Sequence, residues 1–320
     1  MNLTQPFNIV ALAGGVGGAK LAHGLAQILP PEHLTIVVNT GDDFEHLGLH
    51  IAPDLDTVMY TLAGLANPET GWGQRDETWN FLAALGRMGA PTWFRLGDRD
   101  LATHVERTRR LRAGEPLSAV TAALCGALGV GPRLLPMSDA PVRTRVDTDE
   151  GELAFQEYFV HRRCEPRVRA VRFAGAAAAS PGPAVFAALE AAAVVIVCPS
   201  NPFLSVDPIL SLRGVRDVLA GKPVVAVSPI VGGQAVKGPA AKMLAELNLE
   251  VSAAAVAAHY AGLAAGFVLD QVDAGLRPAV AAHIPHVSVT DTLMHTDADR
   301  ARLARETLAF AQTLITPFNP

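Results

Sequence analysis

The stretch NIVALAGGVGGAKL, residues Asn8–Leu21, decides how the chain begins to fold. A short apolar run is followed by four glycines and then by a helix-like pattern. This order predicts a strand, a tight turn and a helix, which together open a βαβ unit. The next apolar run, Leu34–Asn39 (LTIVVN), is predicted to be the second strand.

Later parts of the chain return to the same alternation of strand and helix. Continuous apolar runs at Val194–Cys198 and Pro223–Ser228 predict strands that are buried on both faces. Weaker strand patterns lie at Gly266–Leu269 and His286–Val289, and Asp297–Ile315 is predicted to be a closing amphipathic helix. We therefore expect an α/β protein with a Rossmann-like three-layer core and a mostly parallel sheet.

The middle of the chain departs from this pattern. Strand patterns nearly vanish over residues 61–130, which predicts a smaller helical insertion in a core formed by residues 1–60 and 131–320. A loop is expected over residues 40–53. The stretches VRTRVDT and ELAFQEYFVHR are predicted to pair as a hairpin around Asp149–Gly151.

Composition excludes several classes of protein. Half of the 320 residues are apolar and the net charge is -5, which argues against binding to nucleic acid or to an anionic membrane surface. The basic group Arg107, Arg109, Arg110 and Arg112 is interpreted as a solvated helix face. The longest near-apolar stretch, Ala253–Leu269, contains a histidine and two glycines, so it favours a helix, a turn and a strand over a membrane span. Three scattered cysteines predict no disulfide framework and fit the cytoplasm.

The glycine turn is the first candidate site. Glycines between a strand and a helix let the backbone approach a ligand, and the N–H groups at the helix start favour an anion. The glycines are followed by Lys20, so the spacing fits neither a Walker A loop nor the dinucleotide pattern GxGxxG. Phosphate binding is the favoured interpretation, and a tight turn without a ligand is the alternative.

Four carboxylates form the second candidate site. Asp42 and Asp43 follow the second strand, and Asp54 and Asp56 lie at the start of the next predicted helix. Because open α/β sheets place their sites beyond the carboxyl ends of strands, these oxygens could hold Mg²⁺ beside a phosphate. Helix capping by Asp54 and turn formation by Asp42 are the alternatives.

Two further groups of polar residues follow. The segment Arg95–Asp100 (RLGDRD) with Thr103 and His104 could bind a polar ligand or form surface ion pairs. Loops after the late strands carry Ser200–Asn201 and Ser228–Gly233, whose hydroxyl, amide and N–H groups suit a nucleotide; ordinary βα loops are the alternative.

With these groups in order, the chain resembles the 2-phospho-L-lactate transferase family of coenzyme F-420 biosynthesis. The matching stretches, from Gly14 to Met243, are GGVGGAKL, VVNTGDD, PDLDTVMY, RLGDRDLATH, PMSD, SNPFLSVDPIL and SPIVGG with KGPAAKM. The resemblance implies a Rossmann-like core with a smaller helical part. It also implies transfer of a phospho-acid unit from a guanosine diphosphate adduct to the ribityl hydroxyl of the deazaflavin Fo, with release of GMP and use of Mg²⁺.

The resemblance also assigns roles to residues. It implies that Asp56 and Arg95 contact the deazaflavin, that Asp56 and Asp43 are catalytic, and that Asp43, Asp54 and Asp56 hold the metal. The donor phosphates and nucleotide are expected to contact Gly14, Gly15, Gly17, Gly18, Lys20, Ser200, Asn201, Ser228 and Gly232. Similar enzymes are dimers, which predicts a homodimer. Replacing Asp56 by Asn is expected to abolish activity and leave the protein folded.

Two other functions remain open. One is a non-enzymatic regulator of similar fold that binds a nucleotide sugar; the pair PDLDT and LGDRD favours the enzyme over this class. The other is an NAD(P)-dependent dehydrogenase, which the missing third glycine and Asn39 at the end of the second strand disfavour. The motifs leave open which phospho-acid is transferred, phospholactate, phosphoenolpyruvate or phosphoglycerate, and which group acts as a base.

Overall fold

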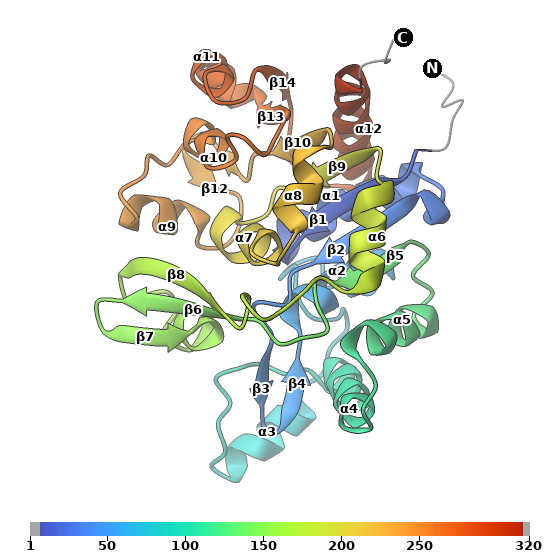
Figure 1. Cartoon of the computed structure of the whole chain (residues 1–320). Coiled ribbons are helices and arrows are strands. Elements are labelled where there is room, and N and C mark those ends of the chain that lie inside the picture. Colours follow the sequence, from blue (N-terminus) through green and yellow to red (C-terminus); the bar gives the residue numbers. More distant parts are fainter. Residues whose placement is uncertain (1–6, 316–320) are drawn as a thin grey trace.

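The computed structural model describes residues 7–315, and its centre is a parallel sheet of seven strands (Figure 1). The strand order is β14-β13-β10-β9-β1-β2-β5. Every neighbouring pair in this sheet is parallel. The strands are β1 (Ile9–Ala13), β2 (Leu34–Val38), β5 (Arg133–Pro136), β9 (Val194–Val197), β10 (Val224–Val227), β13 (Gly266–Asp270) and β14 (His286–Thr290).

Helices cover both faces of the sheet, because its central strands are apolar on both sides. Ile9, Ala11 and Ala13 of β1 join one cluster of buried side chains, and Val10 and Leu12 join the other. The first cluster includes α1 (Gly15–Ile28), α2 (Pro53–Leu62), α5 (Leu117–Ala127) and α12 (Asp297–Leu314). The second includes α6 (Pro183–Ala191), α7 (Asp207–Leu210), α8 (Val215–Ala220), α9 (Ala240–Glu246), α10 (Ala253–His259) and α11 (Arg277–Ala281).

This architecture confirms the predicted α/β three-layer core. All the predicted late strands are present, and the stretch 253–269 forms α10, a turn and β13. Within residues 7–315, no helix has both the length and the apolar character needed to span a bilayer. Short helical turns complete the chain: η1 (Pro31–His33), η2 (Glu157–His161), η3 (Pro202–Val206) and η4 (Gln271–Leu276).

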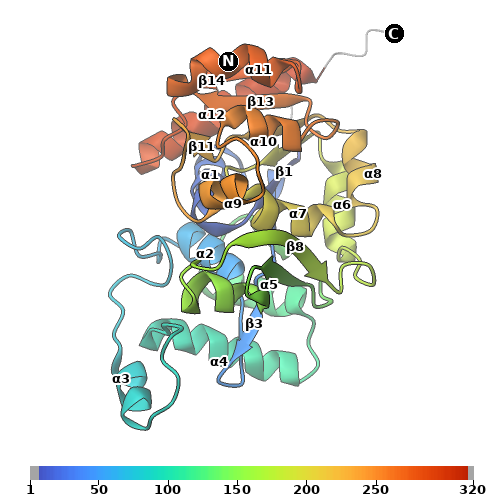
Figure 2. The ribbon, with the colours of Figure 1, turned by 90° about the vertical axis from the view of Figure 1, so that its left-hand side faces the viewer.

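Residues 61–130 contain the end of α2, then α3 (Asn80–Arg87), α4 (Asp98–Arg112) and α5. Figure 2 shows α3 and α4 at the end of the molecule opposite to α11 and α12. Reciprocal caps order this region, since the Asp98 carboxylate accepts from the Phe81 amide at 3.0 Å and Glu77 accepts from the Asp100 amide at 3.0 Å. The division into a core and an insertion stays a prediction.

The expected loop over residues 40–53 contains a small hairpin, which the prediction missed. Strands β3 (Phe44–His46) and β4 (Leu49–Ile51) are antiparallel. Leu47 and Gly48 form the turn with positive φ angles of 54° and 72°, as two-residue hairpin turns require. Leucine rarely adopts a positive φ angle, so Leu47–Gly48 does not match the sequence pattern expected of such a turn.

A second, antiparallel sheet follows β5, with the order β7-β6-β8. Its strands are β6 (Arg143–Thr148), β7 (Gly151–Ala154) and β8 (Val168–Ala174), and β11 (Ile230–Val231) pairs separately with β12 (Gln234–Ala235). The predicted hairpin is confirmed by the β6–β7 pairing. The second predicted strand was too long, because the chain turns helical after Ala154. Phe155 and Tyr158, three residues apart, are both buried there, which suits a helical period.

We expect Gly24→Ala to destabilise the protein by about 1–3 kcal/mol because α1 packs closely on α12. A Cβ atom at position 24 would lie 2.1 Å from the Arg300 carbonyl oxygen. Gly126→Ala is the matched control, since Gly126 is an exposed helical glycine of α5 with nothing within 4 Å of such a Cβ. Urea unfolding of both variants measures the difference. Equal stability of Gly24→Ala and wild type would contradict the packing.

Candidate active site

The glycine turn lies where the strand order of the large sheet reverses. From β1 the chain proceeds to β2 and β5 on one side, and β9 begins the other half. The turn that follows β1 meets the loop that follows β9, because the Gly14 amide donates to Ser200 Oγ at 3.2 Å and that hydroxyl donates back to the Gly14 carbonyl at 2.9 Å. Ligands of open α/β sheets bind at such a reversal point.

Two of the glycines are fixed by close neighbours. A Cβ atom at position 14 would lie 2.4 Å from Asp54 Oδ2, and one at position 17 would lie 2.2 Å from the Pro199 carbonyl oxygen. Neither position therefore has room for a side chain. Gly14, Gly15 and Gly17 line the cavity at the start of α1, where N–H groups of a helix can bind an anion.

Asp54 connects the glycine turn to the end of β2. Its Oδ1 accepts from the Gly15 amide at 2.8 Å, and its Oδ2 accepts from Asn39 Nδ2 at 2.9 Å. The alternative interpretation, in which Asp54 caps its own helix, is wrong. The N-cap of α2 is Ala52, without a side-chain cap, and Asp54 lies inside the first turn. Its two oxygens are instead satisfied by Gly15 and Asn39, outside its own helix.

Asp42 is buried beside Asp54 and has an unsatisfied oxygen. Its Oδ1 is buried and has no hydrogen-bond partner. Burial, followed by the Asp54 charge, raises the pKa of Asp42 well above its ordinary value. Burial raises the pKa of Asp54 to about 6, against the lowering effect of its hydrogen bonds. Within residues 7–315 neither carboxylate has a cationic partner. The two acids are therefore crowded together without a counter-charge from the described residues.

The other two aspartates of the predicted cluster are each paired with a base. Asp43 Oδ2 lies 3.1 Å from His50 Nε2. Asp56 forms a two-pronged ion pair with Arg107, in which Arg107 Nη1 lies 3.0 Å from Asp56 Oδ2. Arg107 is only 1% exposed, so its predicted place on a solvated helix face was wrong. Arg109 and Arg112 do lie on the exposed face, and Arg110 is half-buried.

A second group of potential metal ligands surrounds Asp56. Its carboxylate, that of Asp100 and the His104 imidazole offer atoms that all lie within 4.8 Å of one another. The predicted metal set of Asp43, Asp54 and Asp56 does not form such a group within residues 7–315. The assignment of Asp43, Asp54 and Asp56 as metal ligands stays a prediction.

The glycine turn and the aspartates Asp42, Asp54 and Asp56 line one cavity of about 800 Å³. The predicted site residues that line it are Gly14, Gly15, Gly17, Lys20, Asp54, Asp56, Arg95, Ser200, Asn201 and Ser228. Three predicted residues do not line it. Gly18 packs against Ser200 and Ala13, and the Gly232 amide donates to Asp273 at 2.9 Å. Asp43 lies behind the cavity wall with His50, whereas Asp42 lines it.

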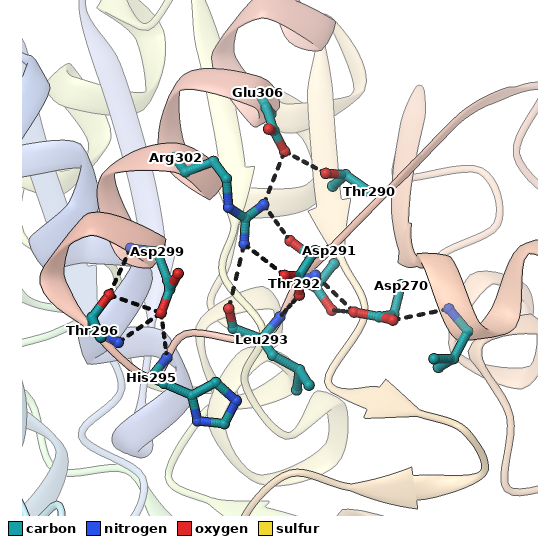
Figure 3. Close-up of polar contacts among 11 residues, drawn as sticks. Asp270, Thr290, Asp291, Thr292, Leu293, His295, Thr296, Asp299, Arg302 and Glu306 are labelled. Carbon is teal, nitrogen blue, oxygen red and sulfur yellow. Dashed lines mark hydrogen bonds and ion pairs between the residues drawn. The ribbon is translucent and has the colours of Figure 1, made fainter.

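The loop between β14 and α12 forms one wall of the cavity. Figure 3 shows how it is held: Asp270 Oδ2 accepts from both the amide and the hydroxyl of Thr292, at 2.7 and 2.8 Å. Arg302 donates to the Asp291 carbonyl at 2.7 Å, and Asp299 accepts from the Thr296 amide at 2.8 Å. Lys20 donates to the Met294 carbonyl at 2.7 Å, which joins the glycine helix to this loop.

Aromatic side chains from two other segments also line the cavity and are called the aromatic wall. Trp93, Phe94, Phe155 and Phe159 line the cavity, and the rings of Phe155 and Phe159 stack at 5.2 Å. Arg95 lies over the Trp79 ring at 4.2 Å. Such a wall suits a flat, conjugated ligand.

The sequence interpretation missed several of these lining residues. The aromatic wall comes from two distant segments, and the loop at 291–296 carries no motif. Asp42, Asp100 and His104 belong to motifs that predicted a site. The neighbouring sequence did not show that these side chains face the cavity.

We expect Asp42→Asn to stabilise the metal-free protein, and the gain to grow as the pH rises from about 4 to 6. In that window the unfolded chain releases the carboxyl protons whereas the folded pair, whose pKa values are raised, retains them. Stability of the wild type is therefore lost as the pH rises, by about 1–3 kcal/mol. Urea unfolding in EDTA, with exposed Asp217→Asn as the control, measures this. A gain that is absent or independent of pH would contradict the charge crowding.

Comparison with known proteins identifies the family. A family model described as "2-phospho-L-lactate transferase CofD" matches residues 9–302. A protein of Streptomyces griseus subsp. griseus named "Phosphoenolpyruvate transferase" is 48% identical over 314 residues, which cover 95% of this chain and 98% of the relative. A "2-phospho-L-lactate transferase" of Methanosarcina mazei is 40% identical over 296 residues, which cover 92% and 98%.

Solved structures agree on the fold alone. A member of the UPF0052 family from Bacillus halodurans is similar with a TM-score of 0.59 at 13% identity, over 95% of this chain and 99% of that chain. The resemblance inferred from the motifs is confirmed: the chain belongs to the 2-phospho-L-lactate transferase CofD family.

Proposed function

We propose that this protein transfers a phosphoenolpyruvyl unit from its guanosine diphosphate adduct to the ribityl hydroxyl of the deazaflavin Fo and releases GMP. One observation carries the proposal. A single cavity of about 800 Å³ joins an anion-binding helix start, a buried acid pair and an aromatic wall. That volume suits two substrates of this size, and the three features match a diphosphate, a cation and a tricyclic ring.

We propose that the donor binds on the side of the cavity that the glycine turn forms. The N-terminus of α1 and Lys20 provide positive potential for its phosphates. Burial, then the charges of Arg300 and Lys237, lower the pKa of Lys20, and a bound anion would raise that pKa again. The loop of Thr292 to His295 lines the same side, next to Lys20, and we propose that the nucleoside of the donor lies against it.

We propose that the acceptor, Fo, binds against the aromatic wall. A deazaflavin ring is flat and conjugated, so the rings of Trp93, Phe94, Phe155 and Phe159 would cover much of it. Asp56 and Arg95 line this part of the cavity, consistent with the contacts that the family resemblance implies. The ribityl chain would then extend toward the donor phosphates.

We propose that Mg²⁺ binds at Asp42 and Asp54. Mg²⁺ prefers carboxylate oxygens, and the buried Asp42 Oδ1 has no other partner. Asp43 and Asp56 are already paired with His50 and Arg107, so we propose Asp42 in place of Asp43 as a ligand. Bound there, the ion would neutralise charge on the donor phosphates.

The reaction needs positioning more than covalent chemistry. The Fo hydroxyl oxygen forms a bond to the phosphorus that carries the acid, and the hydroxyl gives up its proton. The bond from that phosphorus to the bridging oxygen breaks, and GMP leaves with the electron pair. The helix N–H groups hold the phosphates, and the aromatic wall fixes the acceptor; this alignment lowers the barrier.

The choice of phosphoenolpyruvate rests on the relatives. Proteins named "Phosphoenolpyruvate transferase" from Streptomyces species are 47–49% identical to this chain. Those named "2-phospho-L-lactate transferase" are 40% identical. The regulator that binds a nucleotide sugar is not favoured, because these relatives are named as transferases. Homodimer assembly and a cytoplasmic location stay predictions.

We expect the purified protein, given Fo, Mg²⁺ and guanosine adducts of several phospho-acids, to release GMP and form a phosphodiester-linked deazaflavin. The phosphoenolpyruvyl adduct should give the highest kcat/KM in direct competition. Mass spectrometry of the product identifies the acid. A preference for the phospholactyl adduct would refute the assigned acid, and no product with any donor would refute the transferase itself.

Removal of Mg²⁺ with EDTA should abolish GMP release, and Asp42→Asn should lower kcat at least about 100-fold at saturating Mg²⁺. Both changes leave the donor phosphates without a cation. Thermal unfolding with and without Mg²⁺ should show stabilisation of the wild type and none of Asp42→Asn, with Asp217→Asn as the control. Loss of the Mg²⁺ effect in Asp43→Asn, together with its persistence in Asp42→Asn, would assign the ligand to Asp43.

A further inference from the structure

Arg107 is the largest fully buried side chain of the described protein, and the proposed reaction gives it no direct role. It lies on α4, and its partner Asp56 lies on α2. Both terminal nitrogens of the guanidinium face the two oxygens of Asp56, with Nη1 3.0 Å from Oδ2. Asp56 lines the cavity and Arg107 does not, so Arg107 lies behind the carboxylate.

The two-pronged contact fixes the plane of the carboxylate. A planar guanidinium binds both oxygens at once, which a lysine ammonium cannot do. Asp56 therefore cannot rotate about its terminal bond without losing one contact. Its orientation in the cavity is set by α4.

The neighbours of Arg107 hold this arrangement. Arg107 Nη1 lies 3.4 Å from His104 Nδ1, and because a guanidinium can only donate, this contact is a hydrogen bond in the tautomer that carries its hydrogen on Nε2. Nε2 lies 3.2 Å from Asp100 Oδ2, and Tyr60 donates to Asp100 Oδ1 at 2.7 Å. The network thus returns to α2 through Tyr60, and it joins the two helices at both of its ends.

We infer that Arg107 is a positioning residue that orients Asp56 toward the deazaflavin substrate. This inference rests on the proposed function, in which Asp56 contacts that substrate. Stability alone is a weak reason for the pair, because apolar residues of similar volume often stabilise a protein as well as a buried ion pair does. Because the Asp56 carboxylate lines the cavity, replacing the pair by apolar residues would remove this carboxylate from the substrate site.

The test compares Arg107→Lys, Arg107→Met, Asp56→Asn and the double variant Asp56→Asn/Arg107→Met. Arg107→Met and Asp56→Asn each leave one buried group unpaired, so both should lower Tm. The double variant removes both charges and should regain most of that loss. Exposed Arg109→Met, on the same helix, is the control for activity and stability.

Kinetics separate positioning from a structural role. Arg107→Lys keeps the charge and loses the planar fork, and it should lower kcat/KM for Fo about 100-fold while KM for the donor is unchanged. The double variant should be no less active than Asp56→Asn alone, because Arg107 acts through Asp56.

Two results would overturn the inference. One is wild-type kcat/KM for Fo in Arg107→Lys. The other is a loss in the double variant equal to the product of the two single losses, which would make the residues independent. An inactive wild type would instead contradict the proposed function, so the two failures are distinct.

Discussion

The carboxylate of Asp54 is the contact on which the site depends. It accepts from the Gly15 amide and from Asn39 Nδ2, and so it ties the first turn of α2 to the ends of β1 and β2. Asn39 in turn accepts from the Gly41 amide at 2.7 Å and donates to the Leu204 carbonyl at 3.1 Å. A side chain at position 14 would clash with Asp54, so Asp54 can lie here only because residue 14 is glycine.

Asp42 and Asp54 lie together in this arrangement, and their crowded charges lower the stability of the protein. Among the described residues, Asp43 and Asp56 have basic partners, whereas Asp42 and Asp54 have none. A protein selected only for stability would remove one of these charges. Crowded carboxylates of raised pKa are typical of functional sites, where a ligand completes the charge balance. The acid pair thus links the fold of the glycine turn to the chemistry that we propose beside it.

The sequence predicted the elements that depend on local pattern. Buried strands such as Val194–Cys198 are apolar on both faces, and the glycine turn must lie between a strand and a helix, so both could be placed without a structure. The surroundings of α4 could not, because the burial of Arg107 depends on its contact with Asp56, which lies 51 positions away. The same holds for the aromatic wall, whose residues line one cavity only because the segment after β7 and the segment before α4 are brought together.

The most direct test of this account is a crystal structure of the protein with Mn²⁺ in place of Mg²⁺ and with GDP in place of the donor. The account predicts one anomalous peak between the carboxylates of Asp42 and Asp54, with the diphosphate beside the start of α1. A peak at Asp56, Asp100 and His104 would contradict it, as would a diphosphate bound away from the glycine turn.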